Sequence, residues 1–313
     1  MILTVTVNPA LDYTVRLDAL EIGKRARYRD PSIDAAGKGI NVARMARRLG
    51  EATLALGFAA GPTGDLLRQR LDQEGVPHDL ISTPGLTRIN VTLLTGPEGS
   101  ATHLHGAGDP VRSEDLQRLM DRTSEHLSHA KVLVFSGSLP PGVSPVAIAG
   151  ILELAKQRRV LTIVDAETEM LAAAIRAGAD VVKPNSLEVG EFLGREVKGV
   201  DAAVRAARDV QAMGVATVVI TLRGDGAVAV DGSFAWHARP PKDNVVRAIG
   251  AGDSFAAGLG VALSRGAGLP EALRLAAAAG AATARHSGTG LGSLAEVDEL
   301  RSRVDLRPLT GPP

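Results

Sequence analysis

Hydrophobic residues along this chain occur either in short continuous runs or at helical spacing, and segments of the two kinds alternate. Short runs of β-branched and apolar residues predict buried strands at residues 2–7, 52–58, 132–135, 161–164, 181–182 and 217–221. Between these runs, apolar residues at helical spacing predict helices over residues 39–49, 65–74, 113–127, 145–158, 186–193 and 202–213. Strands that alternate with such helices are typical of βαβ units. We therefore expect an α/β fold with a mostly parallel sheet.

Two regions depart from this alternation. Residues 12–33 contain short strand-like pieces with many charges, and residues 88–105 alternate apolar and polar positions around a turn at 96–99. Because two-stranded pieces are marginal alone, we hypothesise that the two regions pair into a small separate sheet. The C-terminal third predicts helices over residues 253–263, 270–284 and 294–304, followed by a frayed tail at 310–313. The simplest organisation is one domain, residues 1–313, with a β lid formed by about residues 12–34 and 87–106.

The composition narrows the class of protein and of partner. Hydrophobic residues make up 45% of the 313 residues and charged residues 22%, which suits a folded chain with a large core. Lys+Arg and Asp+Glu both number 35, whereas proteins that bind nucleic acid or membrane surfaces carry a basic excess. We therefore expect no nucleic-acid or membrane partner, and any recognition of phosphate must be local.

The cysteine count and the N-terminus indicate a cytoplasmic protein. The chain has no cysteine, which excludes disulfides, thiolate metal sites and cysteine nucleophiles and fits a reducing compartment. Residues 1–7 have no basic start, and their apolar stretch is too short for a signal peptide. No uninterrupted apolar run reaches the ~18 residues of a membrane span.

The strongest chemical signal is the segment Gly250-Ala251-Gly252-Asp253. It lies between an apolar run at 245–249 and an apolar-periodic run, which predicts a strand, a glycine turn and a helix. A helix N-terminus offers free N–H donors and partial positive charge, and therefore suits a phosphate. Asp253 could accept a proton from an attacking hydroxyl while these N–H groups neutralise the transferring phosphoryl group. The alternative is an aspartate N-cap on an ordinary glycine turn, which these residues alone slightly favour.

A second glycine-rich segment precedes the first predicted helix. Gly37 and Gly39 allow close backbone approach, Lys38 adds a positive charge, and Asn41 adds an amide where the helix starts. A Walker A loop is excluded because G-x-x-x-x-G-K-[ST] is absent from this segment. A plain strand-to-helix turn is an equally good interpretation of these residues alone.

A third segment, Lys183-Pro184-Asn185-Ser186-Leu187-Glu188, precedes another predicted helix. Asn185 and Glu188 have the spacing of a capping box, and this structural role is favoured on the residues alone. The functional alternative places both side chains near a Mg²⁺–triphosphate, which needs oxygen ligands and retained waters.

Two further loops follow predicted strands. Residues 221–227 form either a hairpin-like turn or a nucleotide-phosphate loop, and residues 136–142 lie where ligands bind in open α/β sheets or form a proline-set turn. Asp12 could bind sugar hydroxyls or occupy a turn, while Arg88 and Asn90 open a lid strand. A basic cluster, for which a solvated surface is the favoured interpretation, consists of Lys24, Arg25, Arg27 and Arg29. The histidines at 103, 105, 126 and 129 share no metal-ligand pattern.

Taken together and in this order, these segments resemble the ribokinase/PfkB family of sugar kinases. The resemblance runs from about residue 2 to residue 309. Because Gly-Lys-Gly-x-Asn and Gly-Ala-Gly-Asp occur as an ordered pair, a functional role becomes the favoured interpretation of each motif. It implies a ribokinase-like three-layer αβα sandwich with a mostly parallel central sheet and a small β-sheet lid. The stretches that resemble the 1-phosphofructokinase and tagatose-6-phosphate kinase branch are residues 6–12, 35–43, 87–91, 136–140 and 303–308.

The resemblance implies roles for individual residues. Asp253 would be the catalytic base, and the amides of Gly250, Ala251 and Gly252 the anion hole. The substrate side would comprise two groups: residues for the sugar, which are Asp12, Gly37, Gly39, Asn41 and Asn90, and residues for its phosphate, which are Arg88, Ser138 and Lys38. The basic stretch with Lys24 and Arg27 is similar to lid residues that contact the 6-phosphate in minor 6-phosphofructokinases. The residues facing ATP would be Lys183, Asn185, Glu188, Thr221, Gly224 and Gly226, with Glu188 near Mg²⁺, directly or through water.

The implied reaction is phosphoryl transfer from MgATP to a ketose phosphate. Fructose 1-phosphate, giving fructose 1,6-bisphosphate, is the first choice, and fructose 6-phosphate and tagatose 6-phosphate are the alternatives. A nucleoside or ribose kinase is disfavoured by Arg88 and the basic cluster, and a non-enzymatic sugar-phosphate-binding regulator by the intact Asp253. The resemblance also implies a K⁺ site, with backbone at residues 247, 249 and 287 as weak candidates, and a homodimer formed through the lid.

Overall fold

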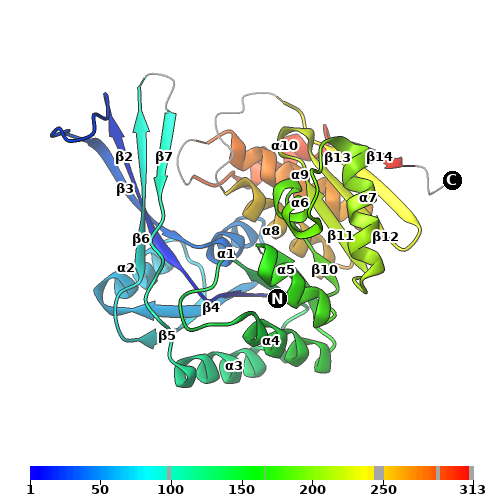
Figure 1. Ribbon diagram of the computed structural model, residues 1–313, viewed down its shortest axis with the longest axis horizontal. Helices are drawn as coiled ribbons and strands as arrows, with labels where there is room; N and C mark the ends of the chain where they lie inside the picture. Colours follow the sequence, from blue (N-terminus) through cyan, green and yellow to red (C-terminus); the bar gives the residue numbers. More distant parts are fainter. Residues whose placement is uncertain (97–99, 166, 243–249, 287–289, 310–313) are drawn as a thin grey trace.

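The computed structural model describes residues 1–96, 100–165, 167–242, 250–286 and 290–309. Within these ranges, ten strands form one sheet in the order β14-β13-β12-β11-β10-β9-β8-β1-β4-β5 (Figure 1). Neighbours from β11 to β5 run parallel, whereas β12, β13 and β14 extend the sheet antiparallel. The strands are β1 Ile2–Thr6, β4 Thr53–Ala60, β5 His78–Thr83, β8 Val132–Ser136, β9 Leu161–Asp165, β10 Val181–Val182, β11 Thr217–Thr221, β12 Ala227–Asp231, β13 Phe234–Arg239 and β14 Asp305–Leu309.

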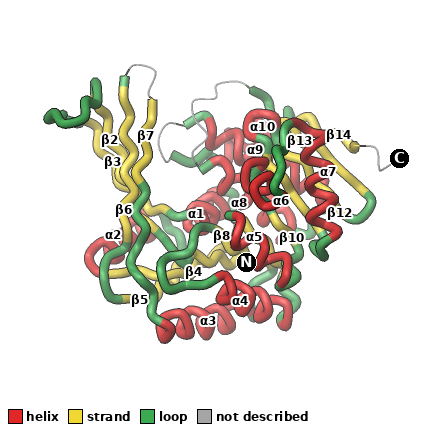
Figure 2. Tube along the Cα trace, in the orientation of Figure 1, coloured by secondary structure: helices red, strands yellow, loops and turns green. Residues whose placement is uncertain are grey.

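Helices cover both faces of this sheet (Figure 2). One apolar cluster joins the sheet to α3 Ser113–Leu127, α4 Pro145–Gln157, α5 Thr168–Arg176, α6 Ser186–Leu193 and α7 Gly199–Ala212. The other joins it to α1 Lys38–Arg48, α8 Ala251–Ser264, α9 Leu269–Ala284 and α10 Leu294–Arg301. α2, Gly61–Gln73, packs beside α1 against β4 in a third cluster. The predicted three-layer α/β fold is therefore confirmed.

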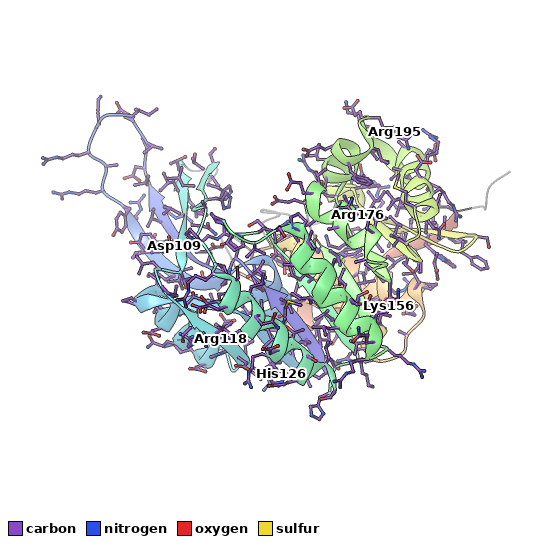
Figure 3. All side chains as sticks on the ribbon, turned by 60° about the horizontal axis from the view of Figure 1, so that its bottom comes forward. Asp109, Arg118, His126, Lys156, Arg176 and Arg195 are labelled. Carbon is purple, nitrogen blue, oxygen red and sulfur yellow. The ribbon has the colours of Figure 1, made fainter. Side chains whose placement is uncertain are left out.

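The central strands read as continuous apolar runs because helices bury both of their faces. Every residue of β1 is buried between β4 and β8. Figure 3 shows α3 and α4 over one face, with Arg118 and His126 labelled on α3 and Lys156 on α4. None of the described helices combines the length and apolarity needed to cross a membrane.

The two central helices α8 and α9 pack very closely because their facing residues are small. A side chain at Gly258 would approach the backbone of Ala276 to 2.8 Å, so the helices can meet only where a glycine stands. This contact holds the N-terminus of α8 at the carboxyl edge of the sheet.

The four strands of the two irregular regions form a second sheet in the order β3-β2-β6-β7. β2 Ala10–Leu17 pairs antiparallel with β3 Arg29–Ala36 and parallel with β6 Arg88–Thr95, and β6 pairs antiparallel with β7 Ser100–Leu104. This sheet projects from one end of the central sheet (Figure 1). The hypothesis of a small separate sheet is confirmed.

Some elements escaped the sequence pattern. β5, α5, β12, β13 and β14 were not predicted, partly because edge strands such as β5 and β14 carry polar residues. β14 even contains Pro308, which an edge strand tolerates. α2 begins at Gly61, four residues before the predicted start, with Pro62 in its first turn. The strand predicted at 245–249 and the frayed tail at 310–313 lie outside the described residues.

Candidate active site

The chemically promising segments converge at the carboxyl ends of the parallel strands, where open α/β sheets bind ligands. α8 begins there, and its N-cap Gly250 adopts the left-handed conformation with φ of 72°. That conformation suits glycine and turns the chain directly into the helix. Asp253 lies in the first turn, so its carboxylate stands beside the amides that the helix leaves unpaired.

Asp253 is almost completely enclosed. Its exposed fraction is 8%, and Nδ2 of Asn41 donates a hydrogen bond to Oδ2 at 2.8 Å across 212 positions of sequence. Burial and the negative charge of Asp165 raise the pKa of Asp253 to about 7, while Asn41, Lys38 and Lys183 act in the opposite direction. A carboxyl group with a pKa near neutrality can accept and release a proton at physiological pH.

Two lysines and two further acids surround this carboxylate. Nζ of Lys183 lies 3.0 Å from Oδ1 of Asp165, and both side chains are almost fully buried. Nζ of Lys38 lies 3.8 Å from Oε1 of Glu188. Burial disfavours the charged ammonium, but Asp165, Glu188 and Asp253 together raise the pKa of Lys38, so it remains cationic. The centre therefore holds two positive charges that could meet transferring phosphate oxygens.

A cavity of about 400 Å³ opens between α8 and the β11–β12 connection. Its lining includes charged residues, which are Lys38, Asp165, Lys183, Glu188, Arg223, Lys242 and Asp253. It also includes apolar residues, which are Phe255, Ala277, Ala281, Ala284, Pro240 and Pro241. A cavity of this size with both kinds of lining suits a nucleotide, whose phosphates need charged partners and whose base needs apolar ones.

The capping-box interpretation of Asn185 is confirmed. Oδ1 of Asn185 accepts from the amides of Leu187 and Glu188, and Oε2 of Glu188 accepts from the amide of Asn185 at 2.8 Å. Both residues also line the cavity, and the cap holds the Glu188 carboxylate beside Lys38. Burial raises the pKa of Glu188.

The carboxylate of Glu188 fits a Mg²⁺ ion that takes most of its ligands from phosphates and waters. Its Oε1 carries no hydrogen bond among the described residues and faces the cationic Lys38. No cluster of three or more acidic or histidine ligands occurs in the described ranges, so the protein offers no complete metal cage there. This donor set suits a metal that arrives with a phosphate ligand.

The segment after β11 forms the hairpin-like turn that was one of its two interpretations. Residues 223–225 form a short 3₁₀ turn that connects the antiparallel strands β11 and β12, and Arg223 has a positive φ of 53°. Thr221, Gly224 and Gly226 line the cavity from this turn. A side chain at Gly226 would collide with the carbonyl of Ala238, so the turn can approach β13 only with glycine there.

The predicted sugar residues lie on the side of the site that faces the small sheet. Nδ2 of Asn90 donates to Oδ1 of Asp12 at 2.8 Å across the β2–β6 pair, and burial raises the pKa of Asp12. Gly37, with φ of 112°, lies against Pro9 and Thr6, where a side chain would approach to 3.0 Å. It is the N-cap of α1, which carries Lys38, Gly39 and Asn41.

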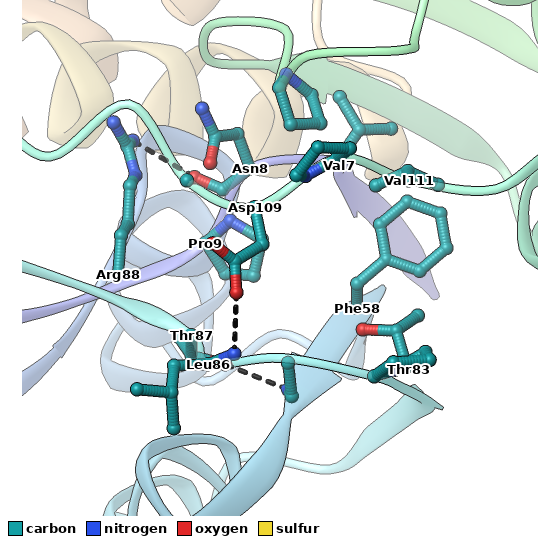
Figure 4. Close-up of a pocket in the computed structure, with 15 residues that line it drawn as sticks. Val7, Asn8, Pro9, Phe58, Thr83, Leu86, Thr87, Arg88, Asp109 and Val111 are labelled. Atoms are coloured by element: carbon teal, nitrogen blue, oxygen red, sulfur yellow. Dashed lines mark hydrogen bonds between the residues drawn. The ribbon is translucent and has the colours of Figure 1, made fainter.

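Arg88 is held by backbone carbonyls. Its guanidinium donates to the carbonyl of Asn8 at 2.9 Å (Figure 4) and to that of Gly106 at 2.8 Å. Its Nε is buried and has no partner among the described residues. Nδ2 of Asn8 also donates to Oγ of Ser138 at 3.3 Å, so Ser138 and Arg88 meet around one asparagine. Burial lowers the pKa of Arg88. The adjoining pocket, closed at one side by the Asp109–Leu86 hydrogen bond, encloses only about 30 Å³.

Some predicted residues are not brought together with the rest. Lys24 and Arg27 lie in the exposed β2–β3 loop, beyond the Leu17–Thr95 end of the sheet, whereas Arg88 pairs with Ala10 at the opposite end. Lys24 forms an ion pair with Glu21 in that loop. The K⁺ candidates at residues 247, 249 and 287 lie outside the described residues.

Asp165 was missed by the motif analysis. It ends β9, a predicted strand, and an acid at the carboxyl end of a parallel strand is a signal that could have found it.

Comparisons with known proteins agree with this arrangement. Residues 6–296 match the family described as pfkB family carbohydrate kinase. The 1-phosphofructokinase of Bacillus subtilis (strain 168) is 34% identical over 284 residues, covering 91% of this chain and 92% of that protein. The 1-phosphofructokinase of Escherichia coli (strain K12) is 33% identical over 305 residues, covering 97% of both. Phosphofructokinase-2 from Escherichia coli in complex with fructose-6-phosphate superposes with a TM-score of 0.90 and 30% identity, covering 96% of this chain and 98% of that one.

Proposed function

Because the chain belongs to the pfkB family of carbohydrate kinases, we propose that it transfers the γ-phosphoryl group of ATP to fructose 1-phosphate, forming fructose 1,6-bisphosphate. The observation that carries the proposal is the buried Asp253, with a pKa of about 7, at the N-terminus of α8 and beside a cavity that suits a nucleotide. The protein is accordingly a phosphotransferase that acts on an alcohol group.

Asp253 is the proposed general base. Its carboxylate takes the proton of the attacking sugar hydroxyl, and the first-turn amides of Gly250, Ala251 and Gly252 neutralise the charge that develops on the phosphoryl oxygens. Lys38 and Lys183 lie close enough to contribute positive charge to the same oxygens. Mg²⁺ bound to the phosphates, with Glu188 as its protein ligand directly or through water, would supply further charge neutralisation.

The phosphosugar is proposed to bind between Asp253 and the small sheet. Asp12, Asn90, Asn41 and the backbone of Gly37–Gly39 hold its hydroxyl groups. Arg88, Ser138 and Lys38 hold its existing phosphate, because a guanidinium matches phosphate geometry and Arg88 has a buried Nε–H without a partner in the part of the chain that the structure describes. The small sheet is proposed to close over the sugar as a lid and exclude water, so that ATP is used for transfer instead of hydrolysis.

The identity of the ketose phosphate is tested with a substrate screen. ADP release is coupled to a spectrophotometric readout and measured with fructose 1-phosphate, fructose 6-phosphate and tagatose 6-phosphate, and with unphosphorylated fructose as control. The highest kcat/KM is expected for fructose 1-phosphate. Fructose used equally well would refute the phosphate site, and no ADP release with any sugar would support the non-enzymatic regulator.

Fructose 6-phosphate is the second candidate substrate. The structural neighbour in complex with that sugar superposes over nearly the whole chain. A higher kcat/KM for fructose 6-phosphate in the same screen would decide for this alternative.

A homodimer through the small sheet is also part of the proposal. Apolar side chains are exposed at Leu20, Ile22 and Tyr28 of the β2–β3 loop and at Ile89 and Leu104 of the sheet itself, and Ile22 is fully exposed. Exposed apolar patches of this kind are typical of association surfaces. A cytoplasmic location completes the proposal, because ATP and phosphorylated ketoses are available there.

A further inference from the structure

A buried arginine, Arg44, contacts the asparagine that binds the proposed base and belongs to none of the motifs discussed above. Arg44, on α1, is 3% exposed. Its Nη2 lies 2.7 Å from Oε1 of Glu74, and its Nε lies 2.9 Å from Oε2 of the same carboxylate. The third arm, Nη1, donates to the carbonyl of Ala35 at 2.9 Å and to Oδ1 of Asn41 at 3.2 Å. One guanidinium therefore joins α2, strand β3 and the side chain of Asn41.

The contact with Asn41 determines which end of that amide faces the base. The two ends of an asparagine amide have nearly the same shape, but one only accepts and the other only donates. Arg44 can only donate, so it holds Oδ1, and Nδ2 is left to donate to Asp253 at 2.8 Å. With the amide reversed, Oδ1 of Asn41 would face Oδ2 of Asp253 across the same distance of 2.8 Å.

We propose that Arg44 is a positioning residue for phosphoryl transfer, which fixes the Asn41 amide so that it donates to the Asp253 carboxylate. The role rests on the proposed function, since Asp253 is the base of that reaction. Arg44 does not touch the cavity and acts only through Asn41.

Glu74 makes this arrangement rigid. It ends α2 and binds the guanidinium of Arg44 with both oxygens, and its Oε2 lies 3.8 Å from Nη2 of Arg48. Arg48 in turn donates to the carbonyl of Leu291 at 2.6 Å. The side chain of Leu291 lies against Gly250, where an added Cβ would be 3.8 Å from it. Arg44 thus contacts the side chain that binds the base, and Arg48 contacts the residue that packs against the glycine of the turn.

A lysine at position 44 could not replace this geometry. Arg44 reaches three acceptor groups in different directions from one planar fork, whereas an ammonium presents its donors from a single point. A lysine would keep the positive charge near Glu74 without reaching both Ala35 and Asn41. This difference separates the effect of charge from the effect of positioning.

The charged groups that act most strongly on the pKa of Asp253 come from several elements: Asp165 at the end of β9, Lys38 on α1 and Lys183 after β10. Arg44→Lys leaves all three in place and keeps a positive charge at position 44. In that variant, a change in the titration of Asp253 would therefore report the loss of the Asn41 hydrogen bond.

The test compares Arg44→Met and Arg44→Lys with Arg265→Lys as a matched control. Arg265 also binds a carboxylate, Glu51, at 2.9 Å and a backbone carbonyl, that of Leu49, at 2.9 Å, but within the described ranges its side chain has no hydrogen bond or ion pair with a residue of the site. In both Arg44 variants the acidic limb of the kcat–pH profile should move to higher pH, because a carboxylate that loses a donor binds its proton more tightly. A shift of about one unit lowers kcat roughly tenfold near pH 6 and hardly at all near pH 9. The control should keep the wild-type limb.

Specific outcomes would overturn the proposal. An unchanged acidic limb in Arg44→Lys, whatever the loss of thermal stability, would mean that charge or packing explains the residue, and this variant decides alone if Arg44→Met does not fold. In an Asn41→Ala background, Arg44→Lys should cause no further shift of the acidic limb. An additional shift would refute the proposal that Arg44 acts through Asn41. Titration of the Asp253 carboxyl followed by ¹³C NMR decides the question without activity. A missing kinase activity would therefore defeat the proposed function separately from this inference.

Discussion

Replacing Asp253 with asparagine should lower activity and raise stability at the same time. The side chain is 8% exposed, and burial, reinforced by Asp165, raises its pKa from 3.8 to about 7. Asparagine keeps the shape and the acceptor for Asn41 but carries no charge and accepts no proton. We expect kcat to fall by at least ~10²-fold, the lower end for a lost general base.

The stability gain follows from the raised pKa. When the folded pKa lies above the unfolded one, the ionised carboxylate destabilises the fold, and this cost grows as the pH rises from about 4 to about 7 and then levels off. One pKa unit corresponds to about 1.4 kcal/mol, so the shift from 3.8 to about 7 amounts to roughly 4 kcal/mol at pH 8. At pH 5 only the interval from 3.8 to 5 contributes, roughly 2 kcal/mol. The asparagine variant should therefore gain about 2–3 kcal/mol more at pH 8 than at pH 5.

Denaturant unfolding of both proteins at pH 5 and pH 8, with turnover measured on the same samples, provides the assay. Asp115→Asn is the control, since Asp115 is also buried but Arg112 and Arg118 hold the pKa of its carboxyl below the usual range. The expected change in stability has the opposite sign, because ionised Asp115 stabilises the fold above the unfolded pKa. Asp115→Asn should therefore lose stability to a similar extent at both pH values while keeping its turnover. Equal stability changes of Asp253→Asn at the two pH values would refute the burial argument. Near-normal turnover would refute the assignment of the base.

Three further predictions concern the ends of the site and the small sheet. Arg88→Ala should raise the KM for fructose 1-phosphate by roughly tenfold or more, since a charge-assisted hydrogen bond contributes about 1.5–3 kcal/mol, and an unchanged KM in steady-state kinetics would exclude it from the phosphate site. Glu188→Gln retains an acceptor for the Asn185 amide but not the charge, so half-maximal velocity should need more Mg²⁺, and an unaltered Mg²⁺ titration would contradict that role. Ile22→Glu places a charge on a fully exposed apolar position of the β2–β3 loop and should shift sedimentation at micromolar concentration towards monomer, whereas wild-type sedimentation as a monomer would dismiss the dimer.

Much of the fold was readable from local pattern. β1 and α3 lie where the periodicity of apolar residues predicts them, because a strand buried on both faces and an amphipathic helix leave strong signals in sequence. β5 and β14 were not readable, because an edge strand needs only one neighbour and tolerates polar residues and even Pro308. Their existence depends on β4 and β13, which pair with them from elsewhere in the chain.

The sequence by itself determined which chemical groups are available and on which elements they stand. The order of Gly37–Asn41 and Gly250–Asp253 along the chain carries the resemblance to the PfkB sugar kinases, and each segment by itself shows only glycines and polar side chains at a helix start. Only the tertiary structure decided what those groups can do. Asn41 meets Asp253 across 212 positions, and the pKa of Asp253 rises because distant segments bury it beside Asp165. Distance and desolvation depend on packing between remote segments, and for that reason no local pattern contained them.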